Sequence, residues 1–253
     1  HNRCRRQRQM CIRDRSNTLI LIRHGKSVWN VKNIFTGWVD VELDDLGKKE
    51  ALKSALLLKE AEIVPSFAFT SFLKRAQNTL QIILEELNIY NLHTETAWEL
   101  NERHYGALQG LNKDEVKKKY GEDQFLKWRR GYSTPPPALP IDSEMNPNKD
   151  DLYKGINNLP LTECLEDTYA RVIPYWENSI KPLVLKNTTI ISAHGNSLRA
   201  LCKYLFDVSD EDITSLEIPT ANPLVISLNN SCKIHSASYL DASRAQKLPI
   251  IGE

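Results

Sequence analysis

Two short apolar runs, each ended by a His-Gly pair, constrain the fold more than any other feature of the sequence. Residues 18–23 are followed by His24-Gly25, and residues 189–193 are followed by His194-Gly195. Short runs rich in branched apolar residues are typical of parallel strands that are buried on both faces. Ligands of open α/β sheets bind beyond the carboxyl ends of such strands. We therefore expect the two histidines to meet across one cleft.

The remaining periodicity predicts an alternation of helices and strands. Residues 72–87 have apolar side chains at steps of three and four, which indicates one buried helix face, and Ser71 is a plausible N-cap. Thr162 is a second plausible N-cap, for a helix that ends near Ile180. Further helices are expected over 45–60, 112–130 and about 197–206, and further strands over 67–71 and 223–228. Strands that alternate with helices predict an α/β fold, a three-layer αβα sandwich with a mostly parallel central sheet.

Charge and proline content suggest how the chain is divided. Residues 1–16 hold six arginines and one acid, whereas the remaining residues carry more acidic than basic side chains. We expect 1–16 to be a basic extension outside the fold, either an artefact of cloning or sequencing, a transit arm or a binding arm. Residues 17–253 should form a single catalytic domain. An insertion or loop region is expected at about 95–160, because Pro135, Pro136 and Pro137 begin a polar stretch.

Composition excludes several classes of protein. No apolar run reaches the roughly 18 residues that a membrane span needs, and the acidic body argues against nucleic acid as a partner. The five cysteines are scattered and form no C-x-x-C pair, so we expect no metal site and no disulfide framework. Reduced thiols in the cytoplasm are the simplest interpretation.

Each histidine taken alone is more simply interpreted as a structural residue, since a lone histidine is more often structural than catalytic. Two histidines at equivalent strand ends, each beside backbone N–H groups that favour anions, make a shared anion site the stronger hypothesis.

Several segments of the sequence together match one known family. The first runs from Leu21 through Arg23-His24-Gly25 to Asn30, and Phe35-Thr36-Gly37-Trp38 follows it. The others are Leu73–Ala76, Leu100–Gly106, Leu108–Lys113, Trp128–Arg130, Pro135–Pro137 and Ala193–Ala200. With these segments the sequence resembles the cofactor-dependent phosphoglycerate mutases of the histidine phosphatase superfamily. The Arg-His-Gly motif is common to the superfamily, whereas the Asn-Glu-Arg-His-Tyr-Gly block and the Trp-Arg-Arg triplet are typical of the mutases.

The resemblance implies catalytic roles that suit the residue types. His24 would be the nucleophile, because a neutral imidazole can attack phosphorus and form a phosphohistidine. Glu102 would be the general acid and base, although the residues alone favour a surface carboxylate paired with a neighbouring cation. Arg23, Arg75 and His194 would surround the transferring group, since arginine binds phosphate oxygens bidentately.

The resemblance also implies a set of substrate-binding residues. Their basic members would otherwise be interpreted as a solvated helix end. They are Ser27, Asn30, Thr36, Gly37, Tyr105, Lys113, Arg129, Arg130, Gly195 and Asn196.

The implied activity is the interconversion of 3-phosphoglycerate and 2-phosphoglycerate, with 2,3-bisphosphoglycerate as the primer and no metal. The alternative is a bisphosphoglycerate mutase or phosphatase, or a phosphomonoesterase, on the same scaffold. A binding protein without activity would need the loss of a central residue, and none is lost. Phosphoglycerates would be the ligands, and the resemblance implies a homodimer or a tetramer in the cytoplasm.

The sequence departs from the family at several places, two of which bear on the expected chemistry. Lys26 follows Gly25 where most of the mutases have glutamate, which changes an acid to a base beside the expected anion site. Few residues follow Ser238 in comparison with the Lys- and Ala-rich tail of the family, and we expect more hydrolysis of the phosphohistidine as a result.

Overall fold

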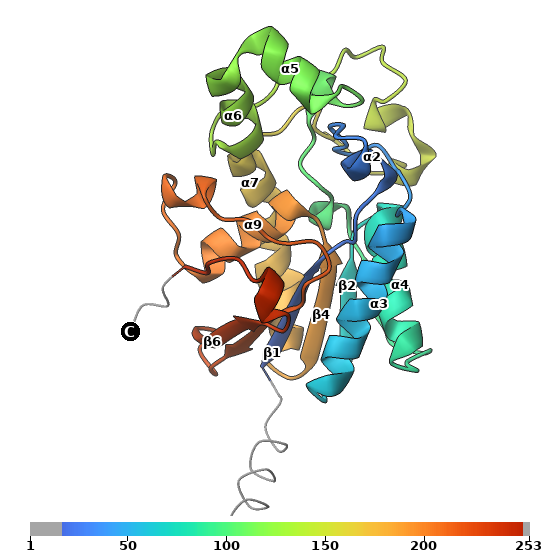
Figure 1. Cartoon of the computed structure of the whole chain (residues 1–253), viewed down its shortest axis with the longest axis vertical. Coiled ribbons are helices and arrows are strands. Elements are labelled where there is room, and N and C mark those ends of the chain that lie inside the picture. Colours follow the sequence, from blue (N-terminus) through green and yellow to red (C-terminus); the bar gives the residue numbers. More distant parts are fainter. Residues whose placement is uncertain (1–16, 250–253) are drawn as a thin grey trace, which may run out of the picture.

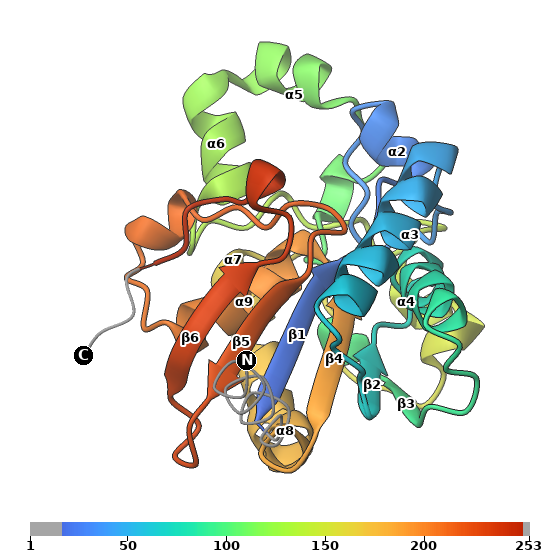
Figure 2. The same cartoon turned by 60° about the horizontal axis from the view of Figure 1, so that its bottom comes forward.

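The computed structural model describes residues 17–249, and it has one six-stranded sheet in the order β3-β2-β4-β1-β5-β6. The strands are β1 (Thr18–Arg23), β2 (Phe67–Thr70), β3 (Thr94–Thr96), β4 (Thr188–Ala193), β5 (Leu224–Leu228) and β6 (Ile234–Tyr239). Figure 2 shows this order across the sheet. The strands β1 to β4 are parallel, and β5 and β6 are antiparallel to their neighbours. The expectation of a mostly parallel sheet is confirmed.

Helices cover both faces of the sheet, as Figures 1 and 2 show. Their bounds are α2 (Val28–Val31), α3 (Asp45–Glu60), α4 (Lys74–Glu86), α5 (Lys113–Tyr120), α6 (Glu122–Arg130), α7 (Leu165–Tyr175), α8 (Lys181–Val184) and α9 (Gly195–Leu205). Alternate side chains of β1 face opposite layers, because successive residues of a strand point to opposite sides. Ile20 and Ile22 pack with α3 and α4, whereas Leu19 and Leu21 pack with α7 and α9. The chain is therefore an αβα sandwich.

Several local expectations need correction. The helix expected over 112–130 is two helices, because Gly121 has a φ of +83° and ends α5. The helix expected to begin after Thr162 begins at Leu165, and a π-helical turn (Trp176–Ile180) separates α7 from α8. Neither expected N-cap is one: the Thr162 hydroxyl donates to the Pro136 carbonyl, and Leu73 precedes α4.

The expected insertion contains α5, α6 and four short 3₁₀ turns (Trp98–Leu100, Gly106–Leu108, Pro147–Lys149 and Asp151–Tyr153). It lies beyond the carboxyl ends of the parallel strands, at the top of Figure 1. That placement puts it opposite the two histidine loops. The basic extension expected over 1–16 lies outside the described residues.

Two backbones touch where the loop after β1 meets α3. A Cβ at Gly25 would collide with the Gly47 backbone, and a Cβ at Gly47 would collide with the Lys26 backbone. The Asp44 side chain accepts a hydrogen bond from the Gly47 amide at 2.7 Å, as an N-cap does. The first turn of α3 therefore fixes the loop that carries His24.

Within residues 17–249, no helix is both long and apolar enough to cross a membrane. In the same part of the chain, no group of His, Cys, Asp or Glu residues is arranged to hold a metal ion. The described cysteines, Cys164, Cys202 and Cys232, are free thiols.

Candidate active site

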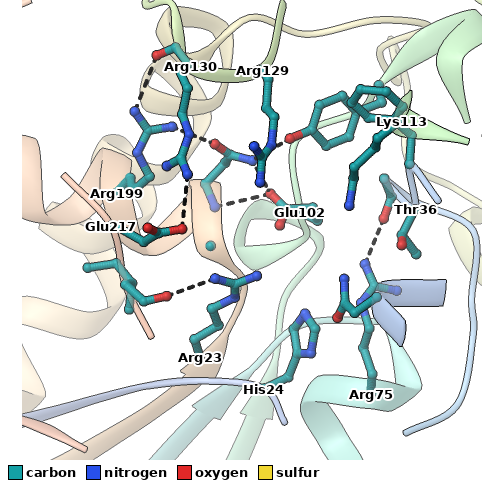
Figure 3. A pocket seen from close by; sticks show the side chains of 17 residues that line it. Arg23, His24, Thr36, Arg75, Glu102, Lys113, Arg129, Arg130, Arg199 and Glu217 are labelled. Atoms are coloured by element: carbon teal, nitrogen blue, oxygen red, sulfur yellow. Dashed lines mark hydrogen bonds and ion pairs between the residues drawn. The ribbon is translucent and has the colours of Figure 1, made fainter. Parts of the chain in front are cut away.

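A polar cavity of about 90 Å³ opens at the carboxyl ends of β1 and β4 (Figure 3). The site is strongly cationic, because six basic side chains and only two carboxylates line it. The lining residues are Arg23, His24, Asn30, Phe35, Thr36, Gly37, Arg75, Glu102, Tyr105, Lys113, Arg129, Arg130, Gly195, Asn196, Arg199, Glu217 and Ile218.

His24 lies at the floor of the cavity as a neutral imidazole with one free nitrogen. Its Nδ1 lies 2.6 Å from the Gly25 carbonyl oxygen, which can only accept, so Nδ1 carries the ring proton. Burial, with the charges of Arg75 and Arg23, holds the pKa of His24 well below its usual range. The Nε2 lone pair therefore stays available for attack on an electrophile.

His194 lies directly beside His24, with the ring centroids 4.9 Å apart. The cause is the sheet register, in which β1 and β4 are parallel neighbours and Arg23 pairs with Ala193. The His194 Nε2 lies 2.7 Å from the Ser71 hydroxyl oxygen, whereas its buried Nδ1 has no partner among the described residues. This buried Nδ1 can therefore form a hydrogen bond with a ligand in the cavity.

Two arginines, the buried Arg75 and the half-buried Arg23, flank His24, as Figure 3 shows. Arg75 donates to the carbonyls of Gly37 at 2.7 Å and Val39 at 3.0 Å, and Arg23 donates to the Ile218 carbonyl at 2.8 Å. Burial lowers the pKa of Arg75 to about 10, which leaves it charged at neutral pH. The buried Nε atoms of both arginines have no partner within residues 17–249.

Glu102 lies across the cavity from His24, as Figure 3 shows. Its Oε1 accepts hydrogen bonds from the Arg103 amide (2.8 Å), the Asn196 amide (3.1 Å) and the Asn196 side-chain nitrogen (2.8 Å). Arg171 donates to the Glu99, Asn101 and Glu102 carbonyls and makes a buried ion pair with Glu163. This network fixes one carboxylate oxygen and leaves the other, Oε2, without a hydrogen bond among the described residues.

Three more cations line the outer end of the cavity. Lys113 and Arg129 form no ion pair within residues 17–249; Lys113 lies over the Phe35 ring and Arg129 over the Phe125 ring. Burial lowers the pKa of both side chains. Arg130 donates to Glu217 at 2.9 Å. The cavity thus has cations at both ends, which suits a ligand with two separated anionic groups.

Tyr105 joins the two ends of the cavity. Its hydroxyl oxygen accepts from the Asn196 side chain and from Arg103, each at 3.2 Å. Burial opposes ionisation, but the charge of Arg103 and these hydrogen bonds lower the pKa of Tyr105.

The sequence model of the histidine phosphatase superfamily (branch 1) matches residues 19–236, which include every element that carries the cavity. The chain belongs to the histidine phosphatase superfamily.

Two relatives show to which branch of the superfamily the chain belongs. The chain is 49% identical over 230 residues to a 2,3-bisphosphoglycerate-dependent phosphoglycerate mutase of Corynebacterium jeikeium, which covers 90% of this chain and 91% of the relative. It is 51% identical over 233 residues to the enzyme of the same name from Borreliella burgdorferi, with 90% and 94% covered. The chain is therefore a member of the mutase branch.

Solved histidine phosphatases share the fold. A mycobacterial glucosyl-3-phosphoglycerate phosphatase matches with a TM-score of 0.66 and 22% identity, over 88% of this chain and 97% of the other. Bacillus stearothermophilus YhfR matches with a TM-score of 0.64 and 21% identity, over 86% and 94%. At such identities the likeness concerns architecture alone.

In this member of the superfamily, the structure brings together nearly all the residues that the sequence suggested. All of them line the cavity except His194, whose ring packs against His24, and Ser27. Ser27 is fully buried and caps α2, where its hydroxyl accepts from the Asn30 amide at 3.2 Å. Ser27 was expected among the substrate-binding residues, but it lies outside the cavity lining and positions Asn30.

The sequence reasoning missed four lining residues: Phe35, Arg199, Glu217 and Ile218. Arg199 lies in the motif after His194, and one helical turn places it where it donates to the Asn196 side chain at 2.8 Å. That spacing on α9 was a usable signal. Glu217 and Ile218 lie in an irregular segment before β5, where no periodicity points to the cavity.

Proposed function

We propose that this chain interconverts 3-phosphoglycerate and 2-phosphoglycerate through a phosphohistidine at His24. The observation that carries the proposal is the neutral His24 Nε2 beside two arginines, with the Glu102 carboxylate opposite it. Phosphoryl transfer depends mainly on positioning and on neutralising the charge of the equatorial oxygens. The names of the relatives at about half identity support the same activity.

The primer implied by those names is 2,3-bisphosphoglycerate, which would supply the phosphoryl group that first charges His24. The cavity suits such a ligand, because unpartnered buried nitrogens of Arg23, Arg75 and His194 surround the inner end. Arg129, Arg130 and Lys113 would hold the carboxylate or the distal phosphate at the outer end.

The roles of His24 and Glu102 follow from their chemistry. Phosphorylated His24 gives its phosphoryl group to the C2 hydroxyl of 3-phosphoglycerate, while Glu102 accepts the hydroxyl proton. His24 then takes the phosphoryl group from the C3 oxygen, and Glu102 returns the proton to that leaving oxygen. Nε2–P and O–P bonds exchange in each half-reaction, so the cycle needs no other reactant.

Arg23, Arg75, His194 and Asn30 would bind the transferring phosphoryl group, with the Gly195 and Asn196 backbone as further donors. Thr36 and Gly37 would form the wall against the carbon chain, beside Tyr105. A carboxyl group with one oxygen fixed by three donors is preorganised for proton transfer through the other oxygen.

The test is one assay in two conditions, 3-phosphoglycerate with and without 2,3-bisphosphoglycerate, in which both 2-phosphoglycerate and free phosphate are followed. We expect isomerisation that the bisphosphate strongly accelerates and that is faster than the accompanying release of phosphate. Phosphate release without isomerisation would replace the mutase with the phosphatase alternative.

We also propose, on the resemblance alone, that the chain acts as a homodimer in the cytoplasm. Light scattering of the purified protein should give twice the mass of one chain. A mass of one or four chains would contradict the dimer.

A further inference from the structure

One of the two carboxylates in the cavity, Glu217, occupies an unexpected position for an anion site. Glu217 lies on the segment between a 3₁₀ turn (Asp212–Thr214) and β5, and it pairs with Arg130 at the outer end. Figure 3 shows Glu217 between Arg130 and Arg23. A carboxylate placed there reduces the positive charge that a multiply anionic ligand would meet.

The ion pair between Arg130 and Glu217 can open when a ligand binds to Arg130. The side chain of Glu217 is 45% exposed and that of Arg130 is 25% exposed. Within residues 17–249, Arg130 forms no ion pair other than this one. A partly solvated pair of this kind contributes at most about 1 kcal/mol, so an incoming phosphate or carboxylate group can displace Glu217 from the guanidinium.

The surroundings keep Glu217 ionised and close to the cavity. Burial opposes its ionisation, but the hydrogen bond from Arg130 and the charges of Arg130, Arg23 and Arg129 lower the pKa of Glu217. The neighbouring Ile218 carbonyl accepts from Arg23 at 2.8 Å, and the Ile213 carbonyl accepts from Arg199 at 2.6 Å. The segment is thus fastened to two site arginines, and the Glu217 side chain can move without it.

We propose that Glu217 is a specificity-determining residue, an internal anion that competes with the ligand for Arg130 and penalises each extra negative charge at the outer end of the cavity. The inference rests on the proposed function, because it takes the phosphoglycerates as the ligands. Glu217 then weakens binding of the bisphosphorylated primer more than binding of a monophosphate, since repulsion grows with the charge of the ligand.

The variants that test the proposal are Glu217→Gln, which removes the charge, and Glu217→Asp, which keeps the charge on a shorter side chain. Glu211→Gln is the matched control, because Glu211 is exposed, lies six positions earlier and does not line the cavity. It changes the net charge of the protein by the same amount as Glu217→Gln.

Two ligands separate binding from catalysis. One is a phosphonate analogue of 3-phosphoglycerate, in which CH₂ replaces the ester oxygen so that no phosphoryl group can be transferred; the other is the corresponding bisphosphonate. Titration calorimetry gives the dissociation constant of each ligand for each protein, whether or not the protein isomerises phosphoglycerates. Failure of the mutase assay would therefore leave this measurement intact.

We expect Glu217→Gln to tighten binding of the monophosphonate about threefold and of the bisphosphonate about tenfold. Glu217→Asp and Glu211→Gln should stay within about twofold of the parent protein. Weaker binding by Glu217→Gln would overturn the proposal, because Glu217 would then merely hold Arg130 in place. Equal tightening of both ligands would overturn the claim of charge selectivity, and so would no change.

Discussion

His24 and His194 lie with their ring centroids 4.9 Å apart, although they are far apart in the sequence. Burial and the nearby arginines hold the pKa of each well below its usual range. Two uncharged rings can share the small space beside Arg23 and Arg75, where two imidazolium ions would repel each other and the arginines. The pairing of β1 with β4 therefore places the two histidines side by side, and their burial beside the arginines keeps them neutral.

His24→Ala should abolish phosphoenzyme formation, because His24 is the only histidine among residues 17–249 that lines the cavity, and the neighbouring His194 ring does not line it. We expect isomerisation to fall by at least about 10⁴-fold. Incubation with labelled 2,3-bisphosphoglycerate, followed by a quench that preserves phosphohistidine, measures the adduct. His235→Ala on the exposed edge strand β6 is the control and should label normally. An acid-labile adduct that survives in His24→Ala would place the nucleophile elsewhere.

Glu102→Gln should slow turnover while substrate binding is largely kept. The amide oxygen can still accept from the Arg103 and Asn196 donors, but the group can no longer accept a proton. We expect kcat to fall by about 10²–10⁴-fold with a small change in KM. Steady-state kinetics in both directions measure this split. A kcat within a few-fold of the parent value would remove Glu102 from the proton transfer.

His104 should make the protein sensitive to acid. Burial lowers its pKa to about 3, whereas the unfolded chain titrates near 6.5. Between these values the unfolded state binds more protons than the folded state, so the free energy of unfolding falls as the pH falls below about 6.5. His104→Gln should remove up to about 1.4 kcal/mol per pH unit from this slope.

Urea unfolding of the parent and His104→Gln proteins between pH 6.5 and 4.5 measures the two slopes. His24 and His194 keep the same direction of dependence in both proteins, so the difference isolates His104. Parallel slopes would show that His104 is already charged in the folded state.

The buried pair of Arg171 and Glu163 should be asymmetric in its effect on stability. Arg171→Met leaves the Glu163 carboxylate buried without a cation, which typically costs about 3–5 kcal/mol. Glu163→Gln should cost less, because Arg171 keeps its three carbonyl acceptors. Arg171→Met should also lower kcat, since those carbonyls hold the loop that carries Glu102.

Chemical unfolding gives the two free energies, and kinetics at a temperature where both variants are folded gives kcat. Equal destabilisation by the two changes, or full turnover by Arg171→Met, would contradict this account of the network.

The strands that carry the histidines could be predicted closely because a doubly buried strand leaves a strong local signal. The run 18–23 and the strand β1 have the same bounds, and β4 begins one residue before the expected run. The edge strands β3 and β6 escaped prediction, since they are partly exposed and lack such a run. The break at Gly121 was missed because the helical composition continues on both sides of it.

The functional site was harder to predict from local sequence patterns than the strands were. The residues alone favoured surface roles for Glu102 and the outer cations, and only the resemblance united them with His24. Glu217 gave no signal, because its importance depends on a tertiary contact with Arg130. Ser71 looked like an N-cap, but its hydroxyl contacts His194 and accepts from the Leu73 amide instead.

The contact of Gly25 with Gly47 has a consequence for how this chain can diverge. A side chain at either glycine meets main-chain atoms of the other segment rather than a side chain that could shrink. A larger residue at one position therefore cannot be compensated by a substitution at the other. Each of the two positions requires glycine on its own. A library randomised at both positions should therefore yield folded protein only from members that carry glycine at each of them.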